Sequence, residues 1–314
     1  MSNPVEYIDR RSGEKVTESV MGDGALRFAY ETLAGRTLWS LLFGSKLISA
    51  IMGRRYDSPS SRKAIAKLVE IPGCRADEAE KPVSEYGSFN EFFTRHLKPG
   101  ARPVGEGFVS PADGRLRLYL GADADSPFPL KGATKSLRQV FAPGADDSQT
   151  LFDFEKTFDV AVIRLAPVDY HRFHFPCDSH VLGEVKVIPG QYHSVNPIAL
   201  VRCPDVYADN ERQIVECDSK YGRYWAVDVG AFGVGTIVQT FRDPVVGEQA
   251  GVVSDKDPED SFFEKGEERG YFKFGGSTVI LVMKAGAVKW DADLVRNSAD
   301  GLETRVFCNE RIGM

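Results

Sequence analysis

Beyond Pro103 the chain breaks into short runs rich in Val, Ile, Phe and Tyr, and Gly, Pro and Asp separate these runs. Apolar runs of this length between turn-forming residues are typical of β-strands. Six of them predict strands: Leu116–Leu120, Val160–Leu165, Val181–Ile188, Arg223–Val229, Thr236–Phe241 and Thr278–Met283. Because so many strands must pair into sheets, we expect a β-rich body that resembles a barrel or a sandwich.

The first hundred residues predict helices rather than strands. Pro and Gly residues separate three helical stretches: Ala25–Met52, Arg62–Glu70 and Ser88–His96. Ser88 suits an N-cap position, since Glu91 follows it three residues later. The sequence therefore predicts an α+β fold with two domains, a helical N-terminal region over residues 1–100 and a β-rich domain over residues 101–314.

The composition of the 314 residues is that of a globular protein, with 42% hydrophobic and 27% charged residues. The formal net charge of -6 argues against a nucleic-acid-binding protein, because such proteins usually carry a basic excess. We therefore expect no nucleic-acid partner. The five cysteines are widely spaced, form no C-x-x-C pair and follow no secretory signal, so we expect them to be reduced in a cytoplasmic compartment.

The stretch Leu38–Met52 comes nearest to a membrane-spanning segment, but it is too short to cross a bilayer, which takes about 20 apolar residues. Its apolar residues recur at roughly helical spacing. The basic residues Arg27, Arg36, Arg54 and Arg55 flank it. Two interpretations are open: a helix that lies in the membrane surface beside anionic head groups, and an amphipathic helix that packs on the protein's own core.

Four of the five histidines, His171, His174, His180 and His193, lie close together in the chain. General acid–base chemistry explains such crowding well, because the ordinary pKa of an imidazole lies near neutrality. A zinc site is the weaker explanation, since no Cys or carboxylate spacing completes a zinc pattern, and we expect no metal. For His180 and His96 we expect structural roles.

Asp113 and Ser277 can complete a catalytic relay with one of these histidines. Asp113 lies in a turn bounded by Pro and Gly, and Ser277 follows two glycines at the start of a predicted strand. Glycine lets a hydroxyl approach the preceding carbonyl without steric conflict. In such a relay the carboxylate orients the imidazole, which takes the serine proton. The structural alternatives are an ordinary turn aspartate and a tight turn before a buried strand.

Motifs spread over about residues 85–285 follow one another in an order that is more specific than any single motif. They are Phe89–Arg95, Leu97-Lys98, Arg102-Pro103, Ser110–Gly114, Asp169–His174, Pro176-Cys177, Pro189-Gly190, Ser194–Asn196, Asn210–Arg212, Val229–Ala231, Val234–Ile237 and Phe274–Thr278. In this order they resemble the pyruvoyl-dependent phosphatidylserine decarboxylase proenzymes. Some members have Leu-Gly-Ser-Thr where this chain has Gly-Gly-Ser-Thr, which resembles the family's second bacterial type.

The resemblance implies that Ser277, activated by a histidine that Asp113 orients, attacks the carbonyl of Gly276. Elimination then cuts the chain between Gly276 and Ser277, which gives a large chain of residues 1–276 and a small chain of residues 277–314. A pyruvoyl group made from Ser277 caps the small chain and serves as the electron sink that decarboxylates phosphatidylserine to phosphatidylethanolamine. We expect His174 to serve the cleavage relay and His171 to protonate the carbanion.

The loop Gln191–Asn196 is expected to bind substrate through Tyr192, His193 and Ser194, with a purely structural loop as the alternative. A membrane lipid as substrate favours the membrane-surface interpretation of Leu38–Met52. We therefore expect a peripheral protein on the cytoplasmic face of the cell membrane, and we also consider a homo-oligomer.

Three other functions stay open. One is an endopeptidase or esterase that uses Asp113, a histidine and Ser277 on another molecule. The second is a non-catalytic carrier module that is modified at Lys284, and the third is a pyruvoyl-dependent decarboxylase of a soluble amino acid.

Overall fold

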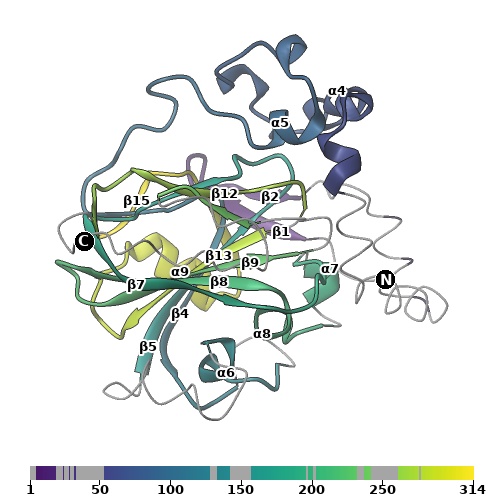
Figure 1. The fold of residues 1–314 in the computed structure, drawn as a ribbon. Coiled ribbons are helices and arrows are strands. Elements are labelled where there is room, and N and C mark those ends of the chain that lie inside the picture. The colour runs from purple at the N-terminus through teal and green to yellow at the C-terminus, as the bar shows by residue number, and fades with distance from the viewer. Residues whose placement is uncertain are drawn as a thin grey trace.

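The computed structural model describes residues 5–18, 24, 28, 32, 53–127, 133–141, 157–195, 197–200, 203–231, 237–241, 261–275 and 277–314. It has an α+β architecture in which most elements are strands of sheets, and the helices are short (Figure 1). The predicted α+β class is thus confirmed. The stretch Leu38–Met52 and the residue Gly276 lie outside the described residues.

A ten-stranded sheet forms the centre of the molecule. Its strands are β1 (Glu6–Asp9), β2 (Lys15–Thr17), β4 (Gly114–Asp123), β5 (Thr157–Leu165), β7 (Ser179–Ile188), β8 (Arg212–Ser219), β9 (Tyr224–Gly230), β11 (Phe262–Phe263), β13 (Ser277–Lys284) and β14 (Glu303–Val306). They lie in the order β11-β7-β8-β9-β13-β5-β4-β14-β1-β2. Neighbouring strands are antiparallel except β1 and β14, which are parallel.

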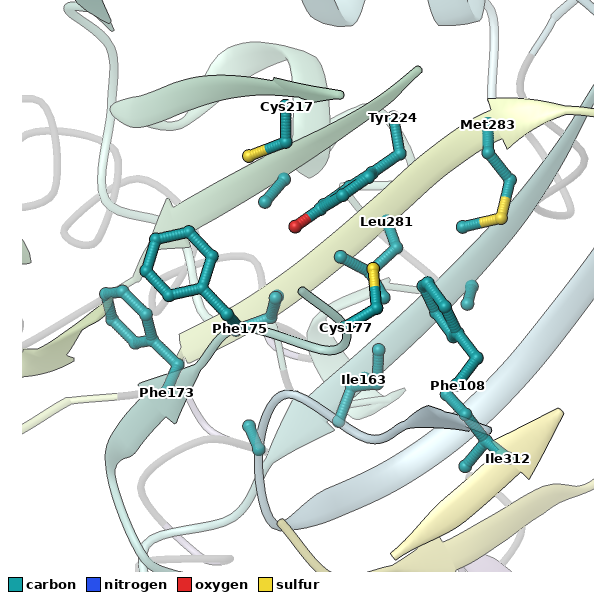
Figure 2. Close-up of a cluster of buried hydrophobic side chains, with 14 of the residues drawn as sticks. Phe108, Ile163, Phe173, Phe175, Cys177, Cys217, Tyr224, Leu281, Met283 and Ile312 are labelled. Carbon is teal, nitrogen blue, oxygen red and sulfur yellow. The ribbon is translucent and has the colours of Figure 1, made fainter. Parts of the chain in front are cut away.

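Two smaller sheets accompany the large one. Their strands are β6 (Arg172–His174), β10 (Ile237–Gln239) and β12 (Glu268–Phe272) in the first, and β3 (Phe108–Val109) and β15 (Arg311–Gly313) in the second. Figure 2 shows an apolar cluster that contains Phe173 of β6 together with Ile163 of β5 and Leu281 of β13. The three-stranded sheet therefore packs on one face of the large sheet.

The large sheet is open, because its edge strands β11 and β2 pair with only one neighbour each among the described strands. The prediction of a barrel-like body is wrong on this point, and layered sheets take its place. Composition identified the six predicted strands, all of which are confirmed. It could not tell which strands pair, because pairing depends on contacts between residues far apart in the chain.

The central strand β13 is buried on both faces. Its side chains alternate, so that Val279 and Leu281 join one apolar cluster while Ile280 and Val282 join another on the opposite face. Burial of each such side chain stabilises the fold by about 1.5–3 kcal/mol. Ser277, the first residue of this strand, is therefore held firmly at its buried end.

The helices are α4 (Lys63–Val69), α5 (Phe89–Phe93), α6 (Leu137–Phe141), α7 (Pro197–Leu200), α8 (Val206–Asp209) and α9 (Ala292–Ala299), with 3-10 turns η1 (Pro59–Arg62), η2 (Ala76–Glu78) and η3 (Val83–Glu85). Helices α4 and α5 lie together at one end of the molecule (Figure 1), and their apolar residues form a third cluster with Ala166 and Val168.

The predicted N-cap is confirmed, because the hydroxyl of Ser88 accepts the Glu91 amide at 3.2 Å. None of the described helices is long and apolar enough to cross a membrane.

The helical prediction for the N-terminal region holds for α4 and α5 but is wrong for residues 6–17, which form the β1–β2 hairpin. This hairpin joins the large sheet through β14, a strand almost 300 positions away in the chain. Local patterns carry no sign of such a distant partner. The division into domains at residue 100 stays a prediction.

Candidate active site

Ser277 lies at the point where β13 meets both of its neighbours. Its cross-strand partners are Leu165 of β5 and Gly230 of β9. The side chain is fully buried, and its hydroxyl makes no hydrogen bond within the described residues. A buried hydroxyl without a partner costs about 1–3 kcal/mol. A role in a chemical reaction would explain why this buried hydroxyl has no partner.

The segment just before the serine is anchored to helix α5. The amide of Phe274 donates to the Asn90 side chain at 2.9 Å, and the Phe274 ring packs edge-on against Phe89 and Phe93, with centroids 4.8 and 5.2 Å away. The motif that includes α5 therefore supports the chain where it enters the glycine pair before Ser277.

His171 lies beside this anchor, fully buried, with its ring centroid 3.8 Å from that of Phe93. Its Nδ1 lies 3.0 Å from the main-chain oxygen of Asp169. Since a carbonyl oxygen only accepts, Nδ1 carries the hydrogen and Nε2 keeps a lone pair. Burial lowers the pKa of His171 to about 3, so the ring is neutral near pH 7. Its Nε2 has no hydrogen-bond partner within the described parts of the chain.

His174 has the same tautomer in a different setting. Its Nδ1 lies 2.9 Å from the oxygen of Gly266, and its Nε2 lies 3.1 Å from the hydroxyl of Tyr170. Burial lowers the pKa of His174 as well. His174 ends the strand β6, which His171 immediately precedes. In an extended chain this spacing places the two rings on opposite faces.

Asp113 is bound by an arginine. Its carboxylate accepts hydrogen bonds from the Arg102 guanidinium at 2.9 and 2.7 Å and from the Cys308 amide at 2.8 Å. Burial alone would raise the pKa of Asp113, but the hydrogen bonds and charge of Arg102 outweigh burial and lower it, so the group is ionised. Its negative charge offsets part of the lowering that burial causes in the pKa of both His171 and His174.

The structure does not bring Asp113 into a hydrogen bond with a histidine among the described residues, because Arg102 occupies both carboxylate oxygens. The turn that holds Asp113 nevertheless contacts the histidine motif, since the His174 amide donates to the Pro111 oxygen at 2.7 Å. Sequence reasoning missed Arg102 as the partner of Asp113. The only signal was the place of Arg102-Pro103 among the ordered motifs.

The loop Gln191–Asn196, described up to residue 195, lies close to the strand that faces Ser277. Asn210 makes the link, because its side-chain NH₂ donates to the oxygens of His193 and Gly230 at 2.8 and 2.7 Å and its oxygen accepts the His193 amide at 2.9 Å. Gly230 is the cross-strand partner of Ser277. The loop is thus held one strand away from the serine.

The three candidate substrate-binding residues of this loop differ in exposure. Tyr192 is buried, and its hydroxyl donates to Glu211 at 2.5 Å. Ser194 is buried too, whereas His193 is partly exposed and its Nε2 lies 2.6 Å from the Gln191 side chain.

Close packing also fixes the entry to the loop at Gly190. A Cβ at this residue would lie 2.4 Å from backbone atoms of Asp209 and Asn210. No other residue fits without a backbone shift, so the glycine lets the loop approach this segment.

The two histidines for which structural roles were expected lie in other surroundings. His180 is exposed on β7 and packs on the ring of Phe262, and His96 is exposed near Glu268. Within the described ranges no group of three or more His, Cys, Asp or Glu side chains is placed to hold a metal ion.

Comparison with known proteins identifies relatives of this chain. The family model for phosphatidylserine decarboxylase matches residues 89–314. The phosphatidylserine decarboxylase proenzyme of Fusobacterium nucleatum subsp. nucleatum is 36% identical over 314 residues, covering 98% of this chain and 97% of the relative. The proenzyme of Ruminiclostridium cellulolyticum is also 36% identical with the same coverage. That of Chlamydia muridarum is 37% identical over 311 residues, covering 98% and 96%. Matches of this extent show that the chain belongs to the phosphatidylserine decarboxylase family.

Proposed function

We propose that this protein decarboxylates phosphatidylserine to phosphatidylethanolamine, using a pyruvoyl group that the chain makes from its own Ser277. The observation that carries the proposal is the fully buried Ser277 hydroxyl, which has no hydrogen-bond partner in the described structure and begins the central strand. The names of the relatives, which are phosphatidylserine decarboxylase proenzymes, agree with a chain that is made in precursor form.

Pyruvoyl formation begins with an acyl shift. The Ser277 oxygen attacks the carbonyl carbon of Gly276 while a histidine takes the hydroxyl proton. The peptide C–N bond breaks, the nitrogen of residue 277 receives a proton, and an ester replaces the amide. Loss of the Cα proton and cleavage of the Cβ–O bond then release Gly276 as a carboxylate. The dehydroalanine that remains takes up water and loses ammonia, which leaves the pyruvoyl group.

The two histidines divide the proton transfers in this proposal. His174 serves the cleavage relay, because its amide donates to the turn that carries Asp113. His171 serves decarboxylation, because its Nε2 is unpartnered among the described residues and can accept and deliver a proton. The pyruvoyl group supplies an electrophilic ketone that acts as the electron sink.

Cleavage leaves two chains that share the sheet. Residues 277–314 contribute β13, which lies between β9 and β5, and β14, which lies between β4 and β1. Their last strand, β15, pairs with β3. The large chain, residues 1–276, thus holds the small chain on both sides of each inserted strand.

We place the protein peripherally on the cytoplasmic face of the cell membrane, where its lipid substrate is accessible. Leu38–Met52 stays the proposed membrane-surface helix, although it lies outside the described residues. What supports the placement is that basic side chains continue beyond it: Arg54, Arg55, Arg62, Lys63 and Lys67 are all exposed. Basic groups near an apolar helix attract anionic head groups.

Substrate tests separate this function from the alternatives. Wild-type protein should release CO₂ and form phosphatidylethanolamine from phosphatidylserine in mixed vesicles, and it should leave free serine and other soluble amino acids unchanged. A Ser277→Ala variant should release no CO₂ and form no phosphatidylethanolamine. Decarboxylation of a soluble amino acid would instead favour a pyruvoyl-dependent amino-acid decarboxylase. Ester or peptide hydrolysis by an uncut chain would favour the endopeptidase or esterase.

A further inference from the structure

We propose that Glu18 is a positioning residue for His171, acting through a chain of buried ion pairs that begins in the β1–β2 hairpin. This inference rests on the proposed function, because it concerns the same histidine. Glu18 follows β2 and lies before residues 89–314, which the family model matches. The proposal therefore gives a role in the active site to a segment outside the recognisable motifs.

The side chain of Glu18 is buried and charged. It is only 4% exposed, and the Glu18 amide donates to the Val5 oxygen at 2.8 Å, which closes the hairpin. Its carboxylate accepts from the Arg164 guanidinium at 3.2 and 2.6 Å and lies 3.9 Å from Nε of Arg115. Burial raises the pKa of Glu18, but the two arginines outweigh burial and lower it to about 2.

Glu18 compensates two positive charges that lie side by side, because Arg115 and Arg164 are direct cross-strand partners on β4 and β5. Both are almost completely buried, and like charges directly opposite each other are destabilising. Negative groups therefore alternate with them. Glu303 binds Arg164 at 3.0 and 2.6 Å, Glu18 lies near both arginines, and Asp169 binds Arg115.

Asp169 connects this network to the histidine. Its carboxylate accepts from Arg115 and from the Ala166 amide, the latter at 2.7 Å, while its own amide donates to the Ala166 oxygen at 2.9 Å. Two hydrogen bonds, one through the side chain of Asp169 and one through its main chain, thus close the turn from Ala166 to Asp169. The main-chain oxygen of Asp169 then accepts the Nδ1 hydrogen of His171 at 3.0 Å.

The direction of the Asp169 carbonyl sets the ring plane of His171 and the direction of its Nε2 lone pair. Arg115 binds the Asp169 carboxylate that closes this turn, and Glu18, hydrogen-bonded to Arg164, compensates the charge of Arg115 from 3.9 Å. Loss of the Glu18 charge leaves Arg164 with Glu303 and Arg115 with Asp169 as their carboxylate partners. The repulsion between the two buried guanidinium groups beside the turn is then less well compensated. Because a small misplacement of a catalytic group slows a reaction strongly, the hairpin bears on proton transfer without touching the substrate.

A matched pair of variants tests the proposal. Glu18→Gln keeps the size of the side chain and removes its charge. Arg10→Met is the control, because Arg10 lies in the turn of the same hairpin and binds Asp291 and Asp293, each at 2.7 Å, and its hydrogen-bond partners within the described residues do not include the histidine turn. Arg10→Met weakens the attachment of the hairpin to residues 277–314, whereas Glu18→Gln weakens its attachment to β4 and β5 and disturbs Arg115.

For each full-length variant we would measure the Tm, the rate of self-cleavage by intact mass, and kcat and KM of the processed enzyme, all well below the lowest Tm. Glu18→Gln should lower kcat by on the order of tenfold with KM unchanged, because His171 serves decarboxylation, and it should leave the cleavage rate near wild type. Arg10→Met should lower the Tm and keep both rates near wild type. Glu18→Asp, which restores the charge on a shorter side chain, should recover part of the lost rate.

A kcat that falls only in proportion to the Tm in both variants would overturn the proposal, and so would an equal kcat for Glu18→Gln and wild type. If Glu18→Gln is not recovered in folded form, Glu18→Asp and Arg10→Met give the same comparison, with a selective loss of kcat expected only for Glu18→Asp. Failure of the proposed function is a different result, because wild-type protein would then neither cleave itself nor decarboxylate phosphatidylserine.

Discussion

Two buried polar atoms, the Ser277 hydroxyl and the Nε2 atom of His171, have no partner within the described residues. Residue type and motif order pointed to both side chains in the sequence. The groups that hold them could not be found that way. Arg102 on Asp113 and the Asp169 oxygen on His171 are set by tertiary contacts, and no local pattern reports such contacts.

The division of labour between the two histidines gives the first prediction. His174→Ala should slow self-cleavage by at least about a hundredfold, in line with the loss of a general base. His171→Ala should cleave itself faster than His174→Ala does, but the cut protein should not decarboxylate phosphatidylserine. A time course of chain cutting on denaturing gels, followed by a turnover assay on the cut protein, separates the two. Wild-type cleavage by His174→Ala would contradict the assignment.

The buried neutral ring of His171 gives a prediction for the pH dependence of stability. Its pKa is about 3 in the folded protein and near 6.5 otherwise. Between these values the unfolded chain binds a proton that the folded protein does not, so the free energy of unfolding falls as the pH falls from about 6.5 toward 3. One proton contributes up to about 1.4 kcal/mol per pH unit.

Urea unfolding of the uncut Ser277→Ala chain at several pH values measures this slope. Adding His171→Ala should flatten the slope. His180→Ala, which removes an exposed ring, serves as the control and should leave it unchanged. Equal slopes for all three proteins would show that His171 is already accessible to protons in the folded state.

At the scale of elements, local signals found the apolar strands and missed the short polar ones. The strand β13 is Ser-Thr-Val-Ile-Leu-Val-Met-Lys and stands out in any reading of the sequence. The strand β14 is Glu-Thr-Arg-Val, and only its pairing with β4 and β1 makes it a strand. The hairpin at residues 6–17 was mistaken for part of a helical region for the same reason.

The loop that is held by Asn210 gives a prediction at this scale. Asn210→Ala removes three hydrogen bonds that tie His193 to Gly230, so it should destabilise the protein by about 2–3 kcal/mol. It should also raise KM, because the loop is the proposed substrate-binding element. Asn297→Ala, which removes one hydrogen bond to Thr304 at a distance from the loop, is the control for thermal unfolding and steady-state assays. An unchanged KM for Asn210→Ala would count against the role of the loop.

At the scale of the whole molecule, the sequence predicted an α+β protein with a β-rich body but neither the open ten-stranded sheet nor its strand order. That order interleaves residues 277–314 with the rest of the chain. Cutting before Ser277 therefore breaks one covalent link and no strand pairing. The two chains should elute together in native size-exclusion chromatography and separate only in denaturant. Separation of the small chain in native buffer would contradict the interleaved arrangement.

The central claim is that Ser277 becomes the reactive group of the enzyme, and the intact mass of purified wild-type protein tests it most directly. We predict two fragments, residues 1–276 and residues 277–314, the latter with the mass of an N-terminal pyruvoyl group in place of serine. Ser277→Ala should give one uncut chain. A wild-type chain that stays intact after prolonged incubation, or a small fragment that still begins with serine, would contradict the claim.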